Sequence, residues 1–181
     1  MQAVLSKEVT FKGNYDPLTL YRALRLINPS PYMFYMSFDE FNVIGASPEI
    51  LVQQQNDKVT IRPIAGTRKR GPNDSEDLAN KIDLLQDDKE KAEHMMLVDL
   101  ARNDLSKVSE TGTVQVDEMM VIEKYSHVMH MTSNVIGEKK PSASSVDCLK
   151  AALPAGTLSG APKIRAMEIL SAHENLSLIH I

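Results

Sequence analysis

The stretch DKEKAEHMMLVDLARNDLSKV, Asp88–Val108, decides the fold of this 181-residue chain. Apolar side chains recur in it at three- and four-residue intervals, which predicts one long helix. Shorter helices are expected over residues 16–27, 75–85 and 145–152. Strands are expected over residues 3–11, 32–38, 41–45, 50–53, 58–64, 114–116 and 121–135, with a basic loop over 66–73. Strands, then helices, then strands predict an α+β fold with a layered, mostly antiparallel sheet.

Composition excludes several classes of protein. The chain is 43% hydrophobic and 24% charged, as soluble globular proteins are. Its net charge of −4 gives no basic surface for nucleic acid, and no apolar run approaches the roughly 20 residues of a membrane span. A signal peptide is not recognisable, and the single Cys148 is compatible with a reducing compartment. We therefore expect a cytoplasmic protein with neither nucleic acid nor membrane as a partner.

The segment LPAGTLSGAPKIR, residues 153–165, combines glycines with a hydroxyl-rich turn before Pro162. Proline suits the first turn of a helix, and glycines let backbone N–H groups approach a ligand. The segment therefore predicts a helix start that can cradle a small anion, either a carboxylate or a phosphate. Taken alone, the segment is better interpreted as a capped helix that binds nothing, and its spacing differs from that of a phosphate-binding P-loop.

Glu90 and Glu93 are three residues apart and share one face of the expected long helix. Glu93 also falls on the apolar stripe of Met96, Leu97 and Leu100, where a carboxylate needs a partner. Mg²⁺ would suit such a pair because it takes one or two carboxylates together with substrate oxygens. A solvated acidic turn is the alternative, and the spacing alone slightly favours that alternative.

Three further candidates carry acid–base or ion-pair chemistry. His127 and His130 are three apart in an expected strand, so they face opposite ways and cannot share a metal. Either is an ordinary strand histidine or an acid–base group. Glu49 in GASPEIL is either a surface turn carboxylate or a pocket acid. Asp99 is spaced to pair with Arg102 or Asn103 along the helix, which indicates a structural role more than chemistry.

Seven longer motifs follow one another over roughly residues 2–170 and resemble those of the chorismate-utilising enzymes. They are QAVLSK from Gln2, NPSPYMFYM from Asn28, GASPEIL from Gly45, RPIAGTRKRG from Arg62, EKAEHMMLVDLARNDL from Glu90, YSHVMH from Tyr125 and PAGTLSGAPKIRAMEI from Pro154. Several long motifs in order are far more specific than one short motif. The resemblance implies the fold of that family and the conversion of chorismate and ammonia to anthranilate and pyruvate, which opens tryptophan biosynthesis.

The resemblance also implies roles for individual residues. It implies that Glu93 is a Mg²⁺ ligand with Glu90 beside it, and that Gly66, Thr67 and Thr157 contact chorismate. It also implies that Glu49 is a general acid and that His130, rather than His127, assists the elimination of pyruvate. Feedback inhibition by tryptophan would involve Pro31, Tyr32 and Met33.

Two positions select a branch of the family. Relatives that add water carry a lysine where this chain has Gln2, and aminodeoxychorismate synthase carries one at Ala65. Neither residue here can act as a nucleophile or strong base, so the resemblance implies external ammonia from a glutamine amidotransferase subunit. The alternatives are another aminating enzyme, which makes aminodeoxyisochorismate or aminodeoxychorismate, and a non-catalytic tryptophan-binding remnant.

The chain departs from the family at both ends. Residues 1–170 are interpreted as part of a chorismate-binding catalytic domain, and residues 171–181 as a tail unlike the family. The family's upstream domain, a second glutamate ligand and a chorismate-binding Tyr and Arg have no counterpart here. We therefore expect an incomplete sheet and no activity of the chain by itself.

Overall fold

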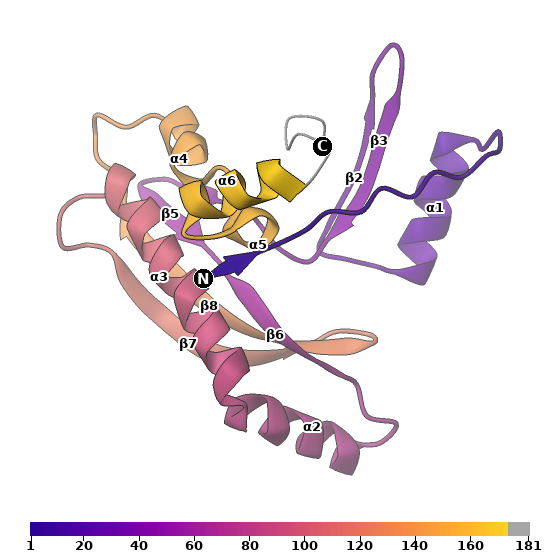
Figure 1. The fold of residues 1–181 in the computed structure, drawn as a ribbon. Helices are drawn as coiled ribbons and strands as arrows, with labels where there is room; N and C mark the ends of the chain where they lie inside the picture. Colours follow the sequence, from indigo (N-terminus) through magenta and orange to yellow (C-terminus); the bar gives the residue numbers. More distant parts are fainter. Residues whose placement is uncertain (174–181) are drawn as a thin grey trace. The chain divides into compact units, whose positions relative to one another are not determined.

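The computed structural model describes residues 1–173, which form two compact units (Figure 1). The smaller unit is Lys7–Ile50, and the larger one combines Met1–Ser6 with the chain from Leu51 onward. No helix within residues 1–173 is long and apolar enough to cross a membrane.

The smaller unit contains one helix and one hairpin, α1 (Pro17–Ile27), β2 (Tyr32–Ser37) and β3 (Asn42–Ser47). Asp16 caps α1 by accepting a 2.8 Å hydrogen bond from the Thr19 amide, and Pro17 occupies the first helical position. Strands β2 and β3 pair antiparallel from Tyr32 opposite Ser47 to Ser37 opposite Asn42. The helix expected over 16–27 and the strands expected over 32–38 and 41–45 are confirmed, within two residues at each end.

The larger unit is built on a five-stranded antiparallel sheet. Its strands are β4 (Gln53–Gln55), β5 (Lys58–Ile61), β6 (Ile64–Lys69), β7 (Gln115–Lys124) and β8 (Val128–Glu138). Strand β8 is central, because it pairs with β7 and also with both β5 and β6. The expected α+β class with a mostly antiparallel sheet is confirmed.

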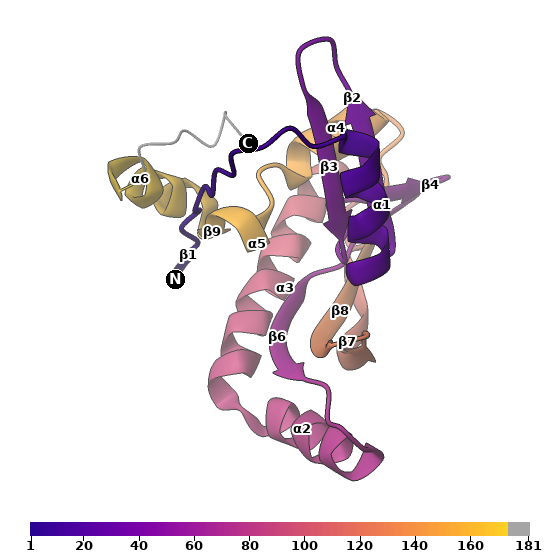
Figure 2. The same ribbon diagram turned by 90° about the vertical axis from the view of Figure 1, so that its right-hand side faces the viewer.

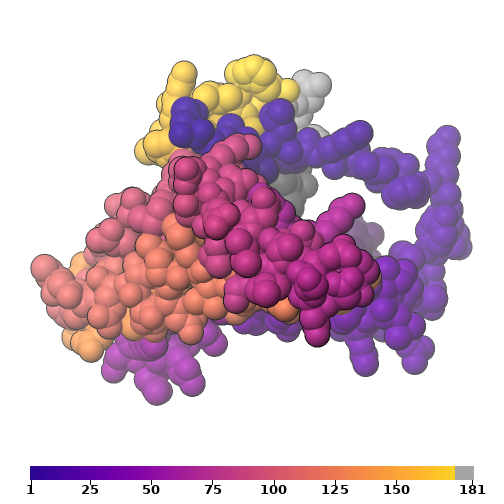
Figure 3. Space-filling model, turned by 90° about the horizontal axis from the view of Figure 1, so that it is seen from below, coloured from indigo at the N-terminus to yellow at the C-terminus, as the bar shows by residue number. Residues whose placement is uncertain are grey.

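Helices α2 (Asp74–Gln86) and α3 (Asp88–Val108) cover one face of this sheet (Figures 1 and 2). Seen from below, α2, α3 and the β7–β8 hairpin form one continuous surface (Figure 3). The buried side chains of α3 are His94, Leu97, Val98, Ala101, Asp104, Leu105 and Val108. The expected stripe is corrected here: it passes through His94, whereas the neighbouring Glu93 is 37% exposed.

The remaining elements are β1 (Gln2–Ala3), α4 (Ser145–Ala152), α5 (Gly156–Ser159), β9 (Gly160–Ala161) and α6 (Lys163–His173). A capping box between Ser144 and Asp147 starts α4 at the predicted residue. Strand β1 pairs with β9, and the two backbones approach closely. A Cβ on Gly160 would lie 2.0 Å from the Gln2 carbonyl oxygen, and its φ of +101° also requires glycine.

Several expected boundaries were wrong. The strand over 3–11 is only Gln2–Ala3, the strand over 50–53 lies at Gln53–Gln55, and the turn at 125–127 separates β7 from β8. Half of the basic loop expected over 66–73 is strand, because residues 66–69 belong to β6 and β8, about 60 residues away, supplies the ladder partners. Of the expected tail, residues 171–173 continue α6, and residues 174–181 lie outside the described residues.

Candidate active site

Strands β6 and β8 bring Thr67 and His130 together. The two residues are paired in register, and Thr67 Oγ1 lies 2.9 Å from His130 Nδ1. On the other side of β8, Glu123 of β7 is paired with His130. The Tyr125 ring meets the imidazole edge-on, with centroids 5.3 Å apart. Two residues that were predicted separately, as a substrate contact and as a catalytic group, thus form one polar pair.

The surroundings of His130 set its charge. Burial lowers the pKa of His130, and the Gly66 carbonyl and the Glu123 carboxylate oppose this only in part. Glu123 is held by the Arg62 guanidinium and accepts a 2.9 Å hydrogen bond from the Tyr125 hydroxyl. A lowered pKa favours the neutral imidazole, which can accept a proton.

Next to Thr67, β6 bulges at Ala65 and Gly66. The pairing with β8 shifts between Ile64 and Thr67, and Gly66 has a φ of +89°. A Cβ on Gly66 would lie 3.3 Å from Leu84 Cδ1 and 3.4 Å from Glu90 Oε2. The positive φ therefore favours glycine here, whereas a Cβ would meet only tight to ordinary contacts.

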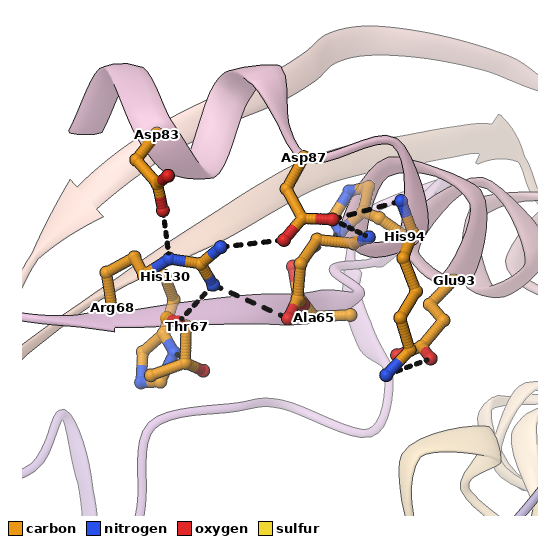
Figure 4. Close-up of polar contacts among 10 residues, drawn as sticks. Ala65, Thr67, Arg68, Asp83, Asp87, Glu93, His94 and His130 are labelled. Atoms are coloured by element: carbon orange, nitrogen blue, oxygen red, sulfur yellow. Dashed lines mark hydrogen bonds and ion pairs between the residues drawn. The ribbon is translucent and has the colours of Figure 1, made fainter. Parts of the chain in front are cut away.

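Arg68, which the sequence interpretation placed in a loop, ties β6 to the two helices. Its guanidinium donates to Asp83 at 2.6 Å, to Asp87 at 2.7 Å and to Glu90 at 3.5 Å (Figure 4). The Glu90 amide and then Arg68 lower the pKa of Asp87. Figure 4 shows this cluster and the Thr67–His130 pair on opposite sides of β6. Successive side chains of a strand point to opposite faces, so Thr67 and Arg68 lie on different sides of β6. Recognising residues 66–69 as a strand would have predicted this arrangement from the sequence.

The two candidate magnesium ligands have different surroundings on α3. Glu90 is engaged by Arg68, whereas the half-exposed Glu93 lies 3.7 Å from Lys89 Nζ on the helix surface. Within residues 1–173, no group of three or more His, Cys, Asp or Glu side chains is arranged to hold a metal ion. Because Mg²⁺ often takes only one or two protein carboxylates, Glu93 fits as one ligand, and Glu90 fits as its neighbour.

The turn that carries Thr157 is partly committed to its own hydrogen bonds. The amides of Leu158, Ser159 and Gly160 donate to Ala155 and Gly156 carbonyls, so fewer N–H groups remain for an anion than the sequence predicted. Strand pairing places Gln2 beside the end of this turn, where it faces Ala161.

Lys163 anchors the same turn to α3. Its ammonium lies 2.6 Å from Asp104 Oδ2 and donates to the Ala152 carbonyl at 2.8 Å. Both side chains are nearly buried, with exposed fractions of 11% and 5%. This lysine is therefore a structural ion-pair partner of the turn.

The other predicted residues lie elsewhere. His127 is in the exposed turn before β8, 2.9 Å from the Ser126 hydroxyl. Glu49 belongs to the smaller unit, where the Ser47 hydroxyl accepts from its amide at 3.3 Å and donates to its carbonyl at 2.9 Å. The proposed feedback residues also belong to that unit and lie at the start of β2: Pro31, Tyr32 and Met33.

Comparison with known proteins identifies the family. A model of the chorismate binding enzymes matches residues 1–177. Anthranilate synthase component 1 of Neisseria meningitidis serogroup A is 58% identical over 96% of this chain, and that of Pseudomonas aeruginosa is 56% identical over 96%. The chain spans 35% of the length of each of these relatives.

Solved structures agree with this grouping. Anthranilate synthase component I from Streptococcus pneumoniae superposes with a TM-score of 0.81 at 49% identity, covering 90% of this chain and 35% of that one. A 2,3-dihydroxybenzoate-specific isochorismate synthase from Bacillus anthracis gives 0.77 at 29% identity, over 91% of this chain and 45% of that one. Sequence and structure thus agree that this chain belongs to the chorismate binding enzyme family.

Proposed function

We propose that this chain forms part of the active site of an anthranilate synthase large component, a cytoplasmic lyase that makes anthranilate, pyruvate and water from chorismate and ammonia. The observation that carries the proposal is the 58% identity to an anthranilate synthase component 1 over 96% of the chain. The Thr67–His130 pair supports it, because it joins a candidate substrate contact to a candidate base.

The proposed chemistry has two stages. Ammonia bonds to C2 of chorismate while the C4 hydroxyl leaves as water, with Glu49 giving the proton. Loss of the C2 proton, assisted by neutral His130, then breaks the C3–oxygen bond. The departing enolpyruvate takes up one proton and becomes pyruvate, and the aromatic ring of anthranilate remains.

The other assigned residues bind and orient the substrate. Gly66 and Thr67 at the β6 bulge and Thr157 at the α5 turn are the proposed chorismate contacts. Glu93 is the proposed Mg²⁺ ligand, with Glu90 held beside it by Arg68. Bound Mg²⁺ would offset the negative charge of the substrate carboxylate.

Two residues favour ammonia over the alternatives. Gln2 and Ala65 supply neither a base for water nor a nucleophile, so the attacking group comes from outside the chain. We propose a glutamine amidotransferase subunit as the source of ammonia. Tryptophan is the proposed feedback ligand at Pro31, Tyr32 and Met33.

The test uses the longest expressed polypeptide that contains these 181 residues, supplied with chorismate, Mg²⁺ and ammonium. We expect anthranilate fluorescence, and a decrease of at least about 10–100-fold for Glu93→Gln, because losing a metal ligand should cost no less than losing an outer-shell partner of one. The matched control Glu110→Gln, an exposed residue away from the site, should retain wild-type turnover.

Product analysis separates the alternatives. Aminodeoxyisochorismate or aminodeoxychorismate as the final product would replace the proposal with another aminating enzyme. Tryptophan binding without any chorismate binding would identify a non-catalytic module instead.

A further inference from the structure

His94 has no part in the proposed chemistry, yet it is fully buried between α3 and the sheet. Its Nδ1 lies 3.0 Å from the Ala65 carbonyl oxygen of β6, and its Nε2 lies 2.7 Å from the Ser133 hydroxyl of β8. One side chain of α3 therefore contacts both strands that carry the Thr67–His130 pair.

The Ala65 carbonyl lies in the bulge of β6, where neither Ala65 nor Gly66 has a partner in the strand register. The partner that the structure places at this carbonyl oxygen is His94 Nδ1, at 3.0 Å. Because a carbonyl only accepts, His94 Nδ1 carries the proton, and Nε2 of the neutral ring accepts from the Ser133 hydroxyl. That hydroxyl in turn accepts from the Met120 amide at 2.9 Å, which completes the chain of hydrogen bonds.

The bulge is held from both faces of the sheet. Ser133 and His130 are three apart in β8, so they face opposite ways, and His94 therefore lies on the face away from His130. On that other face, the Thr67 hydroxyl lies 2.9 Å from His130 Nδ1. Ala65 and Thr67, the two neighbours of Gly66 in β6, thus each contact a histidine: Ala65 contacts His94 on one face, and Thr67 contacts His130 on the other.

We propose that His94 is a positioning residue that fixes the Ala65 carbonyl and thereby sets the Gly66–Thr67 backbone that orients His130. Its role toward chorismate rests on the proposed function, whereas its effect on His130 does not. The proposal assigns this role to Nδ1 alone, and the contact of Nε2 with Ser133 contributes to stability only.

Two substitutions separate the ring nitrogens. The amide nitrogen of Asn replaces Nδ1 of histidine, and that of Gln replaces Nε2. The 181-residue chain is labelled on its histidine rings, and the His130 signal is identified by its loss in His130→Gln. We expect both variants to have lowered Tm values, His94→Asn to keep the wild-type His130 shifts, and His94→Gln to move them.

Chorismate binding provides the second readout, measured by calorimetry with Mg²⁺ on the longest expressed polypeptide that contains this chain. His94→Asn should keep Kd within about 3-fold of wild type, and His94→Gln should weaken binding about 10-fold, the worth of one buried hydrogen bond. His130 shifts that move equally in both variants, or in neither, would overturn the proposal.

Ser133→Ala keeps the test decisive if His94→Gln fails to fold. It removes the Nε2 partner and leaves the contact of Nδ1 with Ala65, so His130 shifts should persist at a lowered Tm. Displaced His130 shifts in Ser133→Ala would overturn the proposal. The wild type could bind no chorismate while the His130 shifts still move in His94→Gln and stay unchanged in His94→Asn. In that case the proposed function fails and the positioning role of His94 stands.

Discussion

The larger and the smaller unit differ in how they bury apolar side chains. In the larger unit, Leu84, Leu105 and Met131 are at most 1% exposed, and they pack against the sheet or within it. In the smaller unit, α1 has no buried residue, and its Leu26 and Ile27 are 85% and 73% exposed. Since burial of apolar surface is the main driving force of folding, the stability of this chain resides in the larger unit.

The largest expected effect comes from truncating the core of the larger unit. Leu105→Ala removes a fully buried side chain from the cluster that includes Val98 and Val135, and it leaves a cavity. We expect a loss of about 2–5 kcal/mol in the free energy of unfolding, measured by urea titration with circular dichroism. A loss below about 1 kcal/mol would contradict the comparison, because it would mean that this core is loosely packed.

The buried ion pair of the α5–α6 turn comes next. Lys163→Met leaves Lys107 as the one remaining ion-pair partner of the Asp104 carboxylate within residues 1–173, and the Lys107 side chain is 51% exposed. We expect a loss of about 2–3 kcal/mol, below the usual cost of breaking a buried pair because Lys107 remains. The control Lys107→Met should cost less than about 1 kcal/mol. Adding Asp104→Asn to Lys163→Met should raise the free energy of unfolding above that of Lys163→Met alone. A further loss of stability would show that Lys163 and Asp104 do not act as a buried ion pair.

A pH-dependent contribution is expected at the start of α2. Asp77 accepts hydrogen bonds from Arg70, Lys124 and the Gly71 amide, and these hold its pKa far below the ordinary value. Such a carboxylate stabilises the fold above its unfolded-state pKa, and the contribution is lost as the pH falls through the folded-state value.

The unfolding free energies of wild type and Asp77→Asn should therefore differ most at neutral pH. The difference in unfolding free energy between wild type and Asp77→Asn should decrease as the pH falls from about 4 to 2. For Asp99→Asn, which changes an exposed residue, the difference from wild type should be small at every pH. A gap for Asp77→Asn that does not depend on pH would show that the carboxylate charge is not what stabilises this region.

The smallest expected effect is that of Leu26→Ala in the smaller unit, the counterpart of Leu105→Ala. Because Leu26 is 85% exposed, the change should be within about 0.5 kcal/mol. The measurement is the same urea titration, and a loss near that of Leu105→Ala would remove the contrast between the units.

The local elements could be predicted because their signals are local. Helices α3 and α4 have their predicted bounds, since periodicity and capping act within a few residues. Strand β6 could not be predicted in the same way, because its sequence IAGTRK resembles a basic loop and its ladder partners lie in β8. The candidate site follows this division: Thr67 and His130 were identified singly, but their pairing depends on register.

The sequence by itself determined the family through the order of its motifs, the long helix and most of the candidate site residues. Only the tertiary structure decided that α3 buries His94 instead of Glu93, that Arg68 engages Glu90, and that Lys163 is committed to Asp104. The physical reason is that burial and ion pairing depend on what a neighbouring element presents. That element lies tens of residues away along the chain, where helical and strand periodicities carry no information.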